Sequence, residues 1–167
     1  MDLNKLPIPF ACVAEDIVTG YEIVFHKGKL ATAMRASMAI PGVFTPVRLD
    51  SMVLVDGGTI NNYPVNVARE MGADIIIGVD VQSDLKSSEK LESTGDILGQ
   101  LINLMGKEQY EKNLQNTDIY IKVDVEGFSA ASFNKAAIDT LIQRGKEAAD
   151  KQLFPLKKLG KELAVSN

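Results

Sequence analysis

The triplet Asp56-Gly57-Gly58 is the part of the sequence best suited to acid–base chemistry. It follows Met52 to Val55, a short apolar run that predicts a strand. Two successive glycines let the backbone turn tightly and leave the preceding carboxylate at the rim of a sheet. The same residues are also typical of an ordinary turn in which an aspartate caps backbone amides. The triplet alone leaves both interpretations open.

Two serines, Ser129 and Ser37, are candidate nucleophiles. Ser129 lies in Gly127-Phe128-Ser129-Ala130-Ala131, between a predicted strand and a predicted helix, which is where the Gly-x-Ser-x-Gly elbow of a serine hydrolase would lie. The second glycine of that elbow is an alanine here. The alternative is a strand-to-helix loop, with Ser132 as N-cap of a helix that begins near Phe133. Ser37 has no flanking glycine and falls inside a predicted helix, which favours a packed or capping hydroxyl.

The remaining candidates favour structural roles. His26 is the only histidine, so a Ser-His-Asp triad would have to use it, but its place after an apolar strand is typical of a solvent-facing turn. Asp80 and Asp124 lie at the ends of predicted strands and suit turns and caps. Cys12, the only cysteine, is expected in the core. We therefore expect no metal site, and without a P-loop or a Gly-x-Gly-x-x-Gly motif we expect no cofactor.

The elements that must position these residues alternate between strand and helix. The β-branched run within residues 74–81 indicates a strand buried on both faces, as in parallel sheets. From Met52 onward the alternation predicts an α/β fold with a mostly parallel sheet and flanking helices, whose active site lies at the carboxyl ends of the strands. We expect strands at residues 8–13, 21–26, 52–55, 74–81 and 119–125, and helices at 30–40, 65–71, 96–114 and 133–153, with a shorter basic helix after Pro155.

Composition limits the function classes. With 167 residues, 46% apolar and 24% charged, the chain suits a single globular domain spanning residues 1–167. A formal net charge of −4 and the lack of a basic cluster argue against a nucleic-acid partner. No apolar run is long enough to span a membrane, and Met1 to Pro9 lacks a signal-peptide pattern. The chain is expected to be soluble as given, and its location stays open between the cytoplasm and an outer-membrane-linked or secreted parent protein.

Several spaced motifs share one resemblance. The stretches at residues 35–46, 54–58 and 61–64 resemble the second signature block of the patatin-like phospholipase family, in the same order. The segment Ile8 to Asp16 and the Met71-Gly72-Ala73-Asp74 strand entry also resemble that family, so the resemblance covers at least Pro7 to Val81. By this matching, Asp56 corresponds to the catalytic aspartate. Gly127-Phe128-Ser129 and the helix after it are similar to bacterial members of the neuropathy-target-esterase type.

The resemblance implies a lipid acyl hydrolase with a Ser-Asp dyad, in a patatin-like three-layer sandwich, that acts on a lipid or acyl-ester substrate. In that family a Gly-x-Ser-x-Gly serine and a glycine-rich oxyanion loop precede the aspartate, and this sequence contains neither. We therefore expect the C-terminal portion of a patatin-like domain, which lacks the N-terminal strands and the nucleophile elbow. Such a fragment would be inactive alone and would self-associate. The full-length protein would be compatible with contact with a membrane surface.

In the complete enzyme, Asp56 would accept the proton of the serine hydroxyl. An aspartate with an ordinary pKa is a weak base at neutral pH, and partial burial would raise that pKa toward a useful range. The alternative function is a non-catalytic α/β module that binds a partner through its strand-exit loops. Substitution of Asp56 in a longer protein separates these two interpretations.

Overall fold

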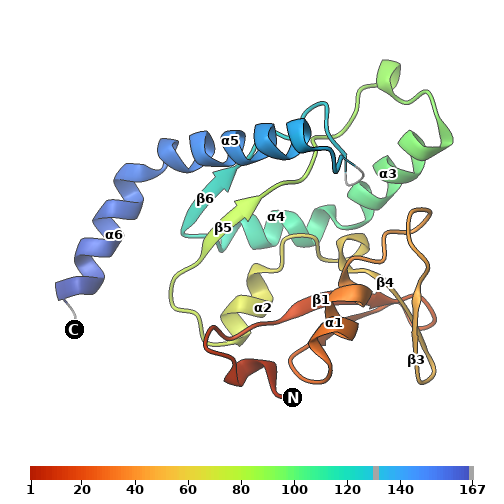
Figure 1. The fold of residues 1–167 in the computed structure, drawn as a ribbon, viewed down its shortest axis with the longest axis horizontal. Coiled ribbons are helices and arrows are strands. Elements are labelled where there is room, and N and C mark those ends of the chain that lie inside the picture. The colour runs from red at the N-terminus through yellow and green to blue at the C-terminus, as the bar shows by residue number, and fades with distance from the viewer. Residues whose placement is uncertain (130–131, 166–167) are drawn as a thin grey trace. The chain divides into compact units, whose positions relative to one another are not determined.

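The computed structural model describes residues 1–129 and 132–165, which fold into two compact units. The first unit comprises Met1–Ala73 and Leu85–Gln115, and the second comprises Asp74–Asp84 and Asn116–Asn167. Each unit has its own sheet (Figure 1) and its own buried apolar cluster.

The first unit contains a four-stranded antiparallel sheet in the order β2-β1-β4-β3. In the β1–β2 hairpin, Asp16 accepts hydrogen bonds from Val18 N (3.2 Å) and Thr19 Oγ1 (2.8 Å), and Gly20 adopts a φ of 74°. The turn predicted near Thr19-Gly20 is therefore confirmed. The strands are β1 (Cys12–Asp16), β2 (Tyr21–Phe25), β3 (Val47–Leu49) and β4 (Met52–Asp56).

The helices of the first unit hold the sheet and the loop that follows β4. Ala36 of α1 is fully buried and packs with Ala14 and Leu54 of the sheet to form the core of this unit. A 3₁₀ turn, η2, follows β4 directly. The helical segments are η1 (Leu3–Lys5), α1 (Leu30–Ser37), η2 (Gly57–Thr59), α2 (Val65–Glu70), η3 (Ser88–Lys90), α3 (Thr94–Met105) and α4 (Lys107–Gln115).

The second unit is built on a parallel pair of strands, β5 (Ile77–Asp80) and β6 (Ile119–Lys122). The helices α5 (Lys135–Lys151) and α6 (Leu153–Val165) complete it. Its buried cluster joins strand side chains to α5 and consists of Ile119, Ile121, Val123 and Ala148. None of the helices in residues 1–129 and 132–165 combines the length and apolarity that a membrane span requires.

The expected fold class, a mostly parallel sheet in a three-layer sandwich, is wrong. Within the described residues, four strands form an antiparallel sheet and only β5 and β6 run parallel. The prediction assumed that each strand after Met52 pairs with the next one along the chain. Instead β4 pairs with β1 and β3, and β3 reaches β4 through the two-residue turn at Asp50-Ser51, which suits antiparallel pairing. The α/β class itself stands.

Individual elements also differ from their predictions. The first strand begins at Cys12 and not at Ile8, which is 82% exposed, because the prolines at positions 7 and 9 cannot donate ladder hydrogen bonds. The helix predicted at residues 96–114 is two helices, α3 and α4, which meet at Gly106. The strand predicted to be buried on both faces alternates, since Ile77 and Val79 are about half exposed.

Candidate active site

Asp56 is held at the end of β4 by contacts on both sides. In the sheet it lies opposite Ala14 of β1, and its backbone N–H donates to Ala39 O at 3.1 Å. Its side chain accepts a hydrogen bond from Gly58 N at Oδ1 (2.7 Å) and so caps the 3₁₀ turn η2. Within the described part of the chain, the other carboxylate oxygen, Oδ2, has no hydrogen-bond partner. That oxygen can accept a proton without breaking a contact.

Both glycines after Asp56 are required by close approach. A Cβ at Gly57 would lie 2.4 Å from the backbone oxygen of Val13, so any side chain there would push β1 and the loop apart. A Cβ at Gly58 would lie 2.9 Å from Asp56 Oδ1 and 2.8 Å from Asn62 Oδ1. The missing side chain at Gly57 therefore allows the loop to pack against β1. The missing side chain at Gly58 leaves room for the Asp56 carboxylate.

The electrostatic environment favours the proton on Asp56. Burial raises the pKa of this carboxyl above its ordinary value of 3.8, and the hydrogen bond from Gly58 N opposes part of that rise. A desolvated carboxylate binds a proton more tightly because it loses the stabilisation that water gives its charge. The pKa of Asp56 is thus shifted upward, as expected for a carboxyl partly buried at the sheet rim.

A buried amide network fixes the rest of the loop. Asn61 is only 2% exposed, and its backbone N–H donates to Gly57 O at 2.7 Å. Its side-chain Nδ2 donates to Glu22 Oε1 and to Asn66 Oδ1, both at 2.9 Å. From α4, Asn113 Nδ2 donates to Asn61 Oδ1 at 3.0 Å and to Asn66 Oδ1 at 3.1 Å. The loop is tied to β2, α2 and α4 together.

Sequence reasoning missed Asn113. It lies in α4, whose residues are mostly polar and charged, and such a segment predicts a solvated helix and not a buried contact. In the structure Asn113 is 2% exposed and also donates to Tyr63 O at 2.8 Å, while the rings of Tyr63 and Tyr110 meet edge to face at 5.7 Å. The only signal in the sequence is the presence of Asn61 and Asn66, whose side-chain amides can hydrogen-bond to that of Asn113 but lie far from it along the chain.

The two candidate serines have structural contacts. The Ser37 side chain, at the end of α1, hydrogen-bonds to the Cys12 thiol, whose pKa is raised by burial. Ser129 is exposed, and its backbone N–H donates to Ser132 Oγ at 3.0 Å. Ser132 is not the N-cap as predicted, because Asn134 caps α5 by accepting from Ala137 N at 2.9 Å. The Ala130-Ala131 part of the decoy motif lies outside the described residues.

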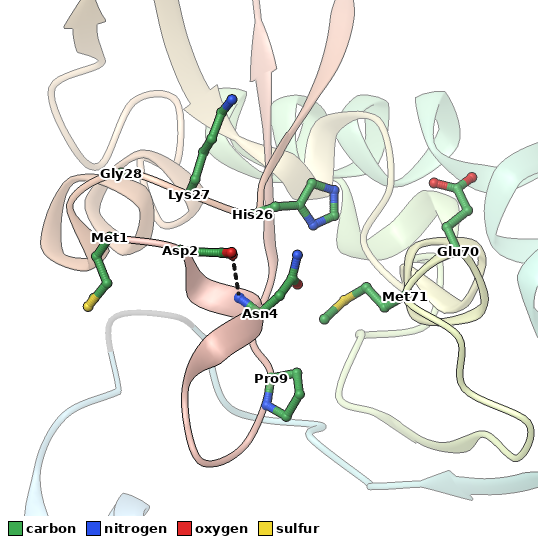
Figure 2. A pocket seen from close by; sticks show the side chains of 9 residues that line it. All are labelled: Met1, Asp2, Asn4, Pro9, His26, Lys27, Gly28, Glu70 and Met71. Atoms are coloured by element: carbon green, nitrogen blue, oxygen red, sulfur yellow. Dashed lines mark hydrogen bonds between the residues drawn. The ribbon is translucent and has the colours of Figure 1, made fainter.

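His26 is half-buried and not solvent-facing as expected. It follows β2 and lines a pocket with Asp2, Asn4, Lys27 and Glu70, among others (Figure 2). Its Nδ1 is buried without a hydrogen-bond partner among the described residues. Asp56 does not line this pocket, so the structure does not bring His26 and Asp56 together in one site.

The other rim carboxylates act as turn residues. Asp80 is 1% exposed and accepts from Gln82 N (2.8 Å), Tyr120 Oη (2.7 Å) and Lys122 Nζ (3.0 Å). Asp124 accepts from Glu126 N at 2.9 Å. Across residues 1–129 and 132–165, no group of three or more His, Cys, Asp or Glu side chains is arranged to hold a metal ion.

Comparison with known proteins places the segment around Asp56 in a family. Residues 2–69 match the family model described as "Patatin-like phospholipase". These residues hold the whole antiparallel sheet, Asp56 and its glycines. This segment therefore belongs to the patatin-like phospholipase family, and the family predicted from the spaced motifs is confirmed.

Individual relatives point to the same group. The chain is 39% identical over 79 residues to an uncharacterized NTE family protein of Mycobacterium tuberculosis. The aligned residues make up 47% of this chain and 22% of that protein. It is 43% identical over 80 residues to a second such protein of the same organism, and the alignment covers 48% of this chain and 14% of that protein. It is 37% identical over 98 residues to patatin-like phospholipase domain-containing protein 7 of Mus musculus, covering 58% and 7%. The chain thus spans less than a quarter of the length of these relatives.

Proposed function

We propose that this chain supplies the catalytic aspartate, Asp56, of a Ser-Asp lipid acyl hydrolase. The observation that carries the proposal is the state of that side chain. It is a half-buried carboxylate with a raised pKa, held at the end of β4 by Gly58 N, within the segment that matches the patatin-like family. The substrate class would be a phospholipid or another acyl ester.

The mechanism follows from the two oxygens of the carboxylate. Oδ1 is fixed by Gly58 N, and Oδ2 would accept the proton as a serine Oγ attacks the ester carbonyl. As the acyl-enzyme forms, Asp56 would pass this proton to the oxygen of the departing alcohol, which returns the carboxylate to its charged form. Asp56 would then take a proton from the water that attacks the acyl-enzyme, and the serine hydroxyl would be restored as the fatty acid departs. The structure supports the base but does not contain an assigned nucleophile.

We also propose that the chain is the C-terminal portion of a patatin-like domain, with the serine and its oxyanion donors on another part of a longer polypeptide. A fluorophosphonate label with intact-mass detection tests this directly on the 167-residue chain. No adduct is expected. A stoichiometric adduct that maps to Ser129 or Ser37 would contradict the assignment of roles.

The test of Asp56 itself needs a longer protein that carries a Gly-x-Ser-x-Gly serine. We expect Asp56→Asn to lower kcat by about 10²–10⁴-fold, because an amide cannot accept the serine proton. Asp124→Asn, which removes an exposed turn carboxylate, is the matched control and should keep its activity. If Asp56→Asn is as active as the parent protein, the alternative of a non-catalytic α/β binding module gains support.

A further inference from the structure

The backbone N–H of Asp56 points to the edge of β4 along which β3 lies. Successive residues of a strand direct their backbone hydrogen-bonding groups to opposite edges. Val53 is bonded on the β1 side, because its N–H donates to Asp16 Oδ1 at 2.9 Å and its carbonyl accepts from Ile17 N at 3.0 Å. Asp56 stands three positions further along and therefore faces the β3 side, where its N–H donates to Ala39 O at 3.1 Å.

The register of β3 offers this N–H a second acceptor. The two strands pair antiparallel, with Val47 opposite Leu54. Two residues further, the same register brings Thr45 opposite Asp56, so that Thr45 O would accept the Asp56 N–H. Pro46 would not prevent this pairing, because its nitrogen would face the outer edge of β3, where no ladder bond forms. The strand nevertheless begins at Val47.

Arg35 of α1 binds this second acceptor. Its Nη2 donates to Thr45 O at 2.7 Å, and its Cζ lies 5.6 Å from the centroid of the Phe44 ring. The loop that ends at Thr45 is itself folded back, since Val43 N and Phe44 N both donate to Ile40 O, at 3.0 and 2.9 Å. These contacts direct the Thr45 carbonyl to α1, and the pairing of β3 with β4 ends two residues short of it.

The acceptor that Asp56 uses instead lies two residues past the end of α1. Ala39 is fully buried, and its own N–H donates to Ala36 O at 3.1 Å. A buried carbonyl needs a donor, and for Ala39 O that donor is the Asp56 N–H. Residues 38–40 therefore lie against the end of β4 and contribute to the burial of Asp56.

Neutralisation of charge does not explain the arginine at position 35. Its Nη1 is buried without a hydrogen-bond partner, and Arg35 forms no ion pair within residues 1–129 and 132–165. An unpaired buried donor costs stability. What the side chain supplies is reach and a flat donor group, which can lie over an aromatic ring and bond a carbonyl at the same time.

We propose that Arg35 is a positioning residue for Asp56. By holding Thr45 O it prevents β3 from extending along β4, and so it keeps the Asp56 N–H on Ala39 O. Without this contact Thr45 O competes with Ala39 O for the same N–H, and residues 38–40 move away from the carboxylate. The effect on catalysis rests on the proposed function, whereas the effect on the hydrogen bond can be measured without it.

The hydrogen bond is measured by NMR on the 167-residue chain. The scalar coupling across a hydrogen bond, from the amide nitrogen of Asp56 to the carbonyl carbon of its acceptor, identifies that acceptor. In the parent chain we expect the coupling to reach Ala39. Arg35→Gln, whose side chain is too short to reach Thr45, should lose this coupling or transfer it to Thr45. Arg35→Lys keeps a donor on a long stem and should retain the coupling to Ala39.

Arg48→Gln is the matched control, because Arg48 is an exposed arginine of β3 itself, and it should leave the coupling at Ala39. Titration of the Asp56 carboxyl gives an independent readout. Its pKa should fall toward the ordinary value of 3.8 in Arg35→Gln, since residues 38–40 no longer shield the charge, and should stay raised in Arg48→Gln. A folded Arg35→Gln with the coupling and the pKa of the parent overturns the inference. If Arg35→Gln does not fold, Arg35→Met, which keeps an apolar stem over Phe44, is judged by the same two measurements.

The effect on catalysis is measured in a longer protein that carries the serine. Arg35→Gln should lower kcat about ten- to hundredfold with little change in KM, because a displaced base is misaligned with its proton donor. Arg35→Lys should recover most of this loss, and Arg48→Gln should keep the parent kcat. If Asp56→Asn is inactive while Arg35→Gln keeps the parent kcat, the positioning role is overturned and the proposed function stands. If Asp56→Asn is active, the proposed function fails, and the coupling to Ala39 alone decides whether Arg35 positions Asp56.

Discussion

Burial of the charged Asp56 carboxylate lowers the free energy of unfolding at neutral pH. Its pKa is raised in the folded state because burial disfavours the charge. A group with a raised pKa in the folded state binds protons more tightly there than in the unfolded chain. Its favourable contribution is therefore complete below the unfolded pKa, near 3.8, and is lost as the pH rises through the folded value.

This linkage predicts that Asp56→Asn is more stable than the parent chain at pH 7, although it is expected to be inactive in a longer protein. The gain should shrink as the pH falls below the folded pKa and should vanish when the parent carboxyl is protonated in both states. Urea unfolding between pH 3 and pH 7 measures the difference. An Asp56→Asn variant that is equally destabilised at every pH would show that the carboxylate is a purely structural cap.

The two glycines beside Asp56 should respond differently to alanine. At Gly57 the new Cβ would meet the backbone of Val13, which cannot move cheaply, so Gly57→Ala should destabilise by about 1–3 kcal/mol or more. At Gly58 the new Cβ would meet two side chains, so Gly58→Ala should cost less stability and displace the Asp56 carboxylate.

Thermal unfolding of both variants tests this difference. Gly99→Ala is the control, because nothing lies within 4 Å of a Cβ at that position in α3. It should stabilise the helix by about 0.5–1 kcal/mol through the ordinary preference for alanine over glycine. Equal effects of Gly57→Ala and Gly99→Ala would contradict the close approach of β1 to η2.

At the scale of elements, α4 acts on the site through Asn113. This residue donates to Asn61, Tyr63 and Asn66 in a region closed to water. Asn113→Ala should therefore cost about 1–3 kcal/mol, since buried amide acceptors lose their donor. Gln115→Ala, at the exposed end of the same helix, should be close to neutral. Denaturant unfolding gives both values, and a neutral Asn113→Ala would contradict the network.

The sequence predicted local features better than pairings. The β1–β2 turn, the strand that ends at Asp56 and the break after it follow from residue types within a few positions. The partners of β4 do not, because the apolar run Met52 to Val55 fits a parallel or an antiparallel neighbour equally well. The burial of Asn113 was also beyond reach, since it depends on asparagines about 50 positions away. The position of the Asp56 carboxylate at the end of a strand could be predicted from the sequence. The strand partners and the hydrogen-bond network that hold its loop in place could not.

At the scale of the whole molecule, the second unit leaves one face of its parallel pair uncovered. Side chains of β6 face α5 in the buried cluster, whereas Ile77 and Val79 of β5 are 49% and 55% exposed, and Val81, directly after β5, is 62% exposed. A contiguous apolar face of this kind favours association, because each contact removes apolar surface from water. We therefore expect any self-association of this chain to use this face.

We expect light scattering at rising protein concentration to show dimers or larger species for the parent chain. Val79→Lys should shift the distribution toward monomer, because association would then have to bury a charge. Ile138→Lys, at a comparably exposed position on α5, controls for the general effect of added charge and should leave the association in place. A parent chain that stays monomeric at every concentration would mean that the β5 face is satisfied within one molecule. Equal effects of both lysines would indicate association driven by net charge and not by this face.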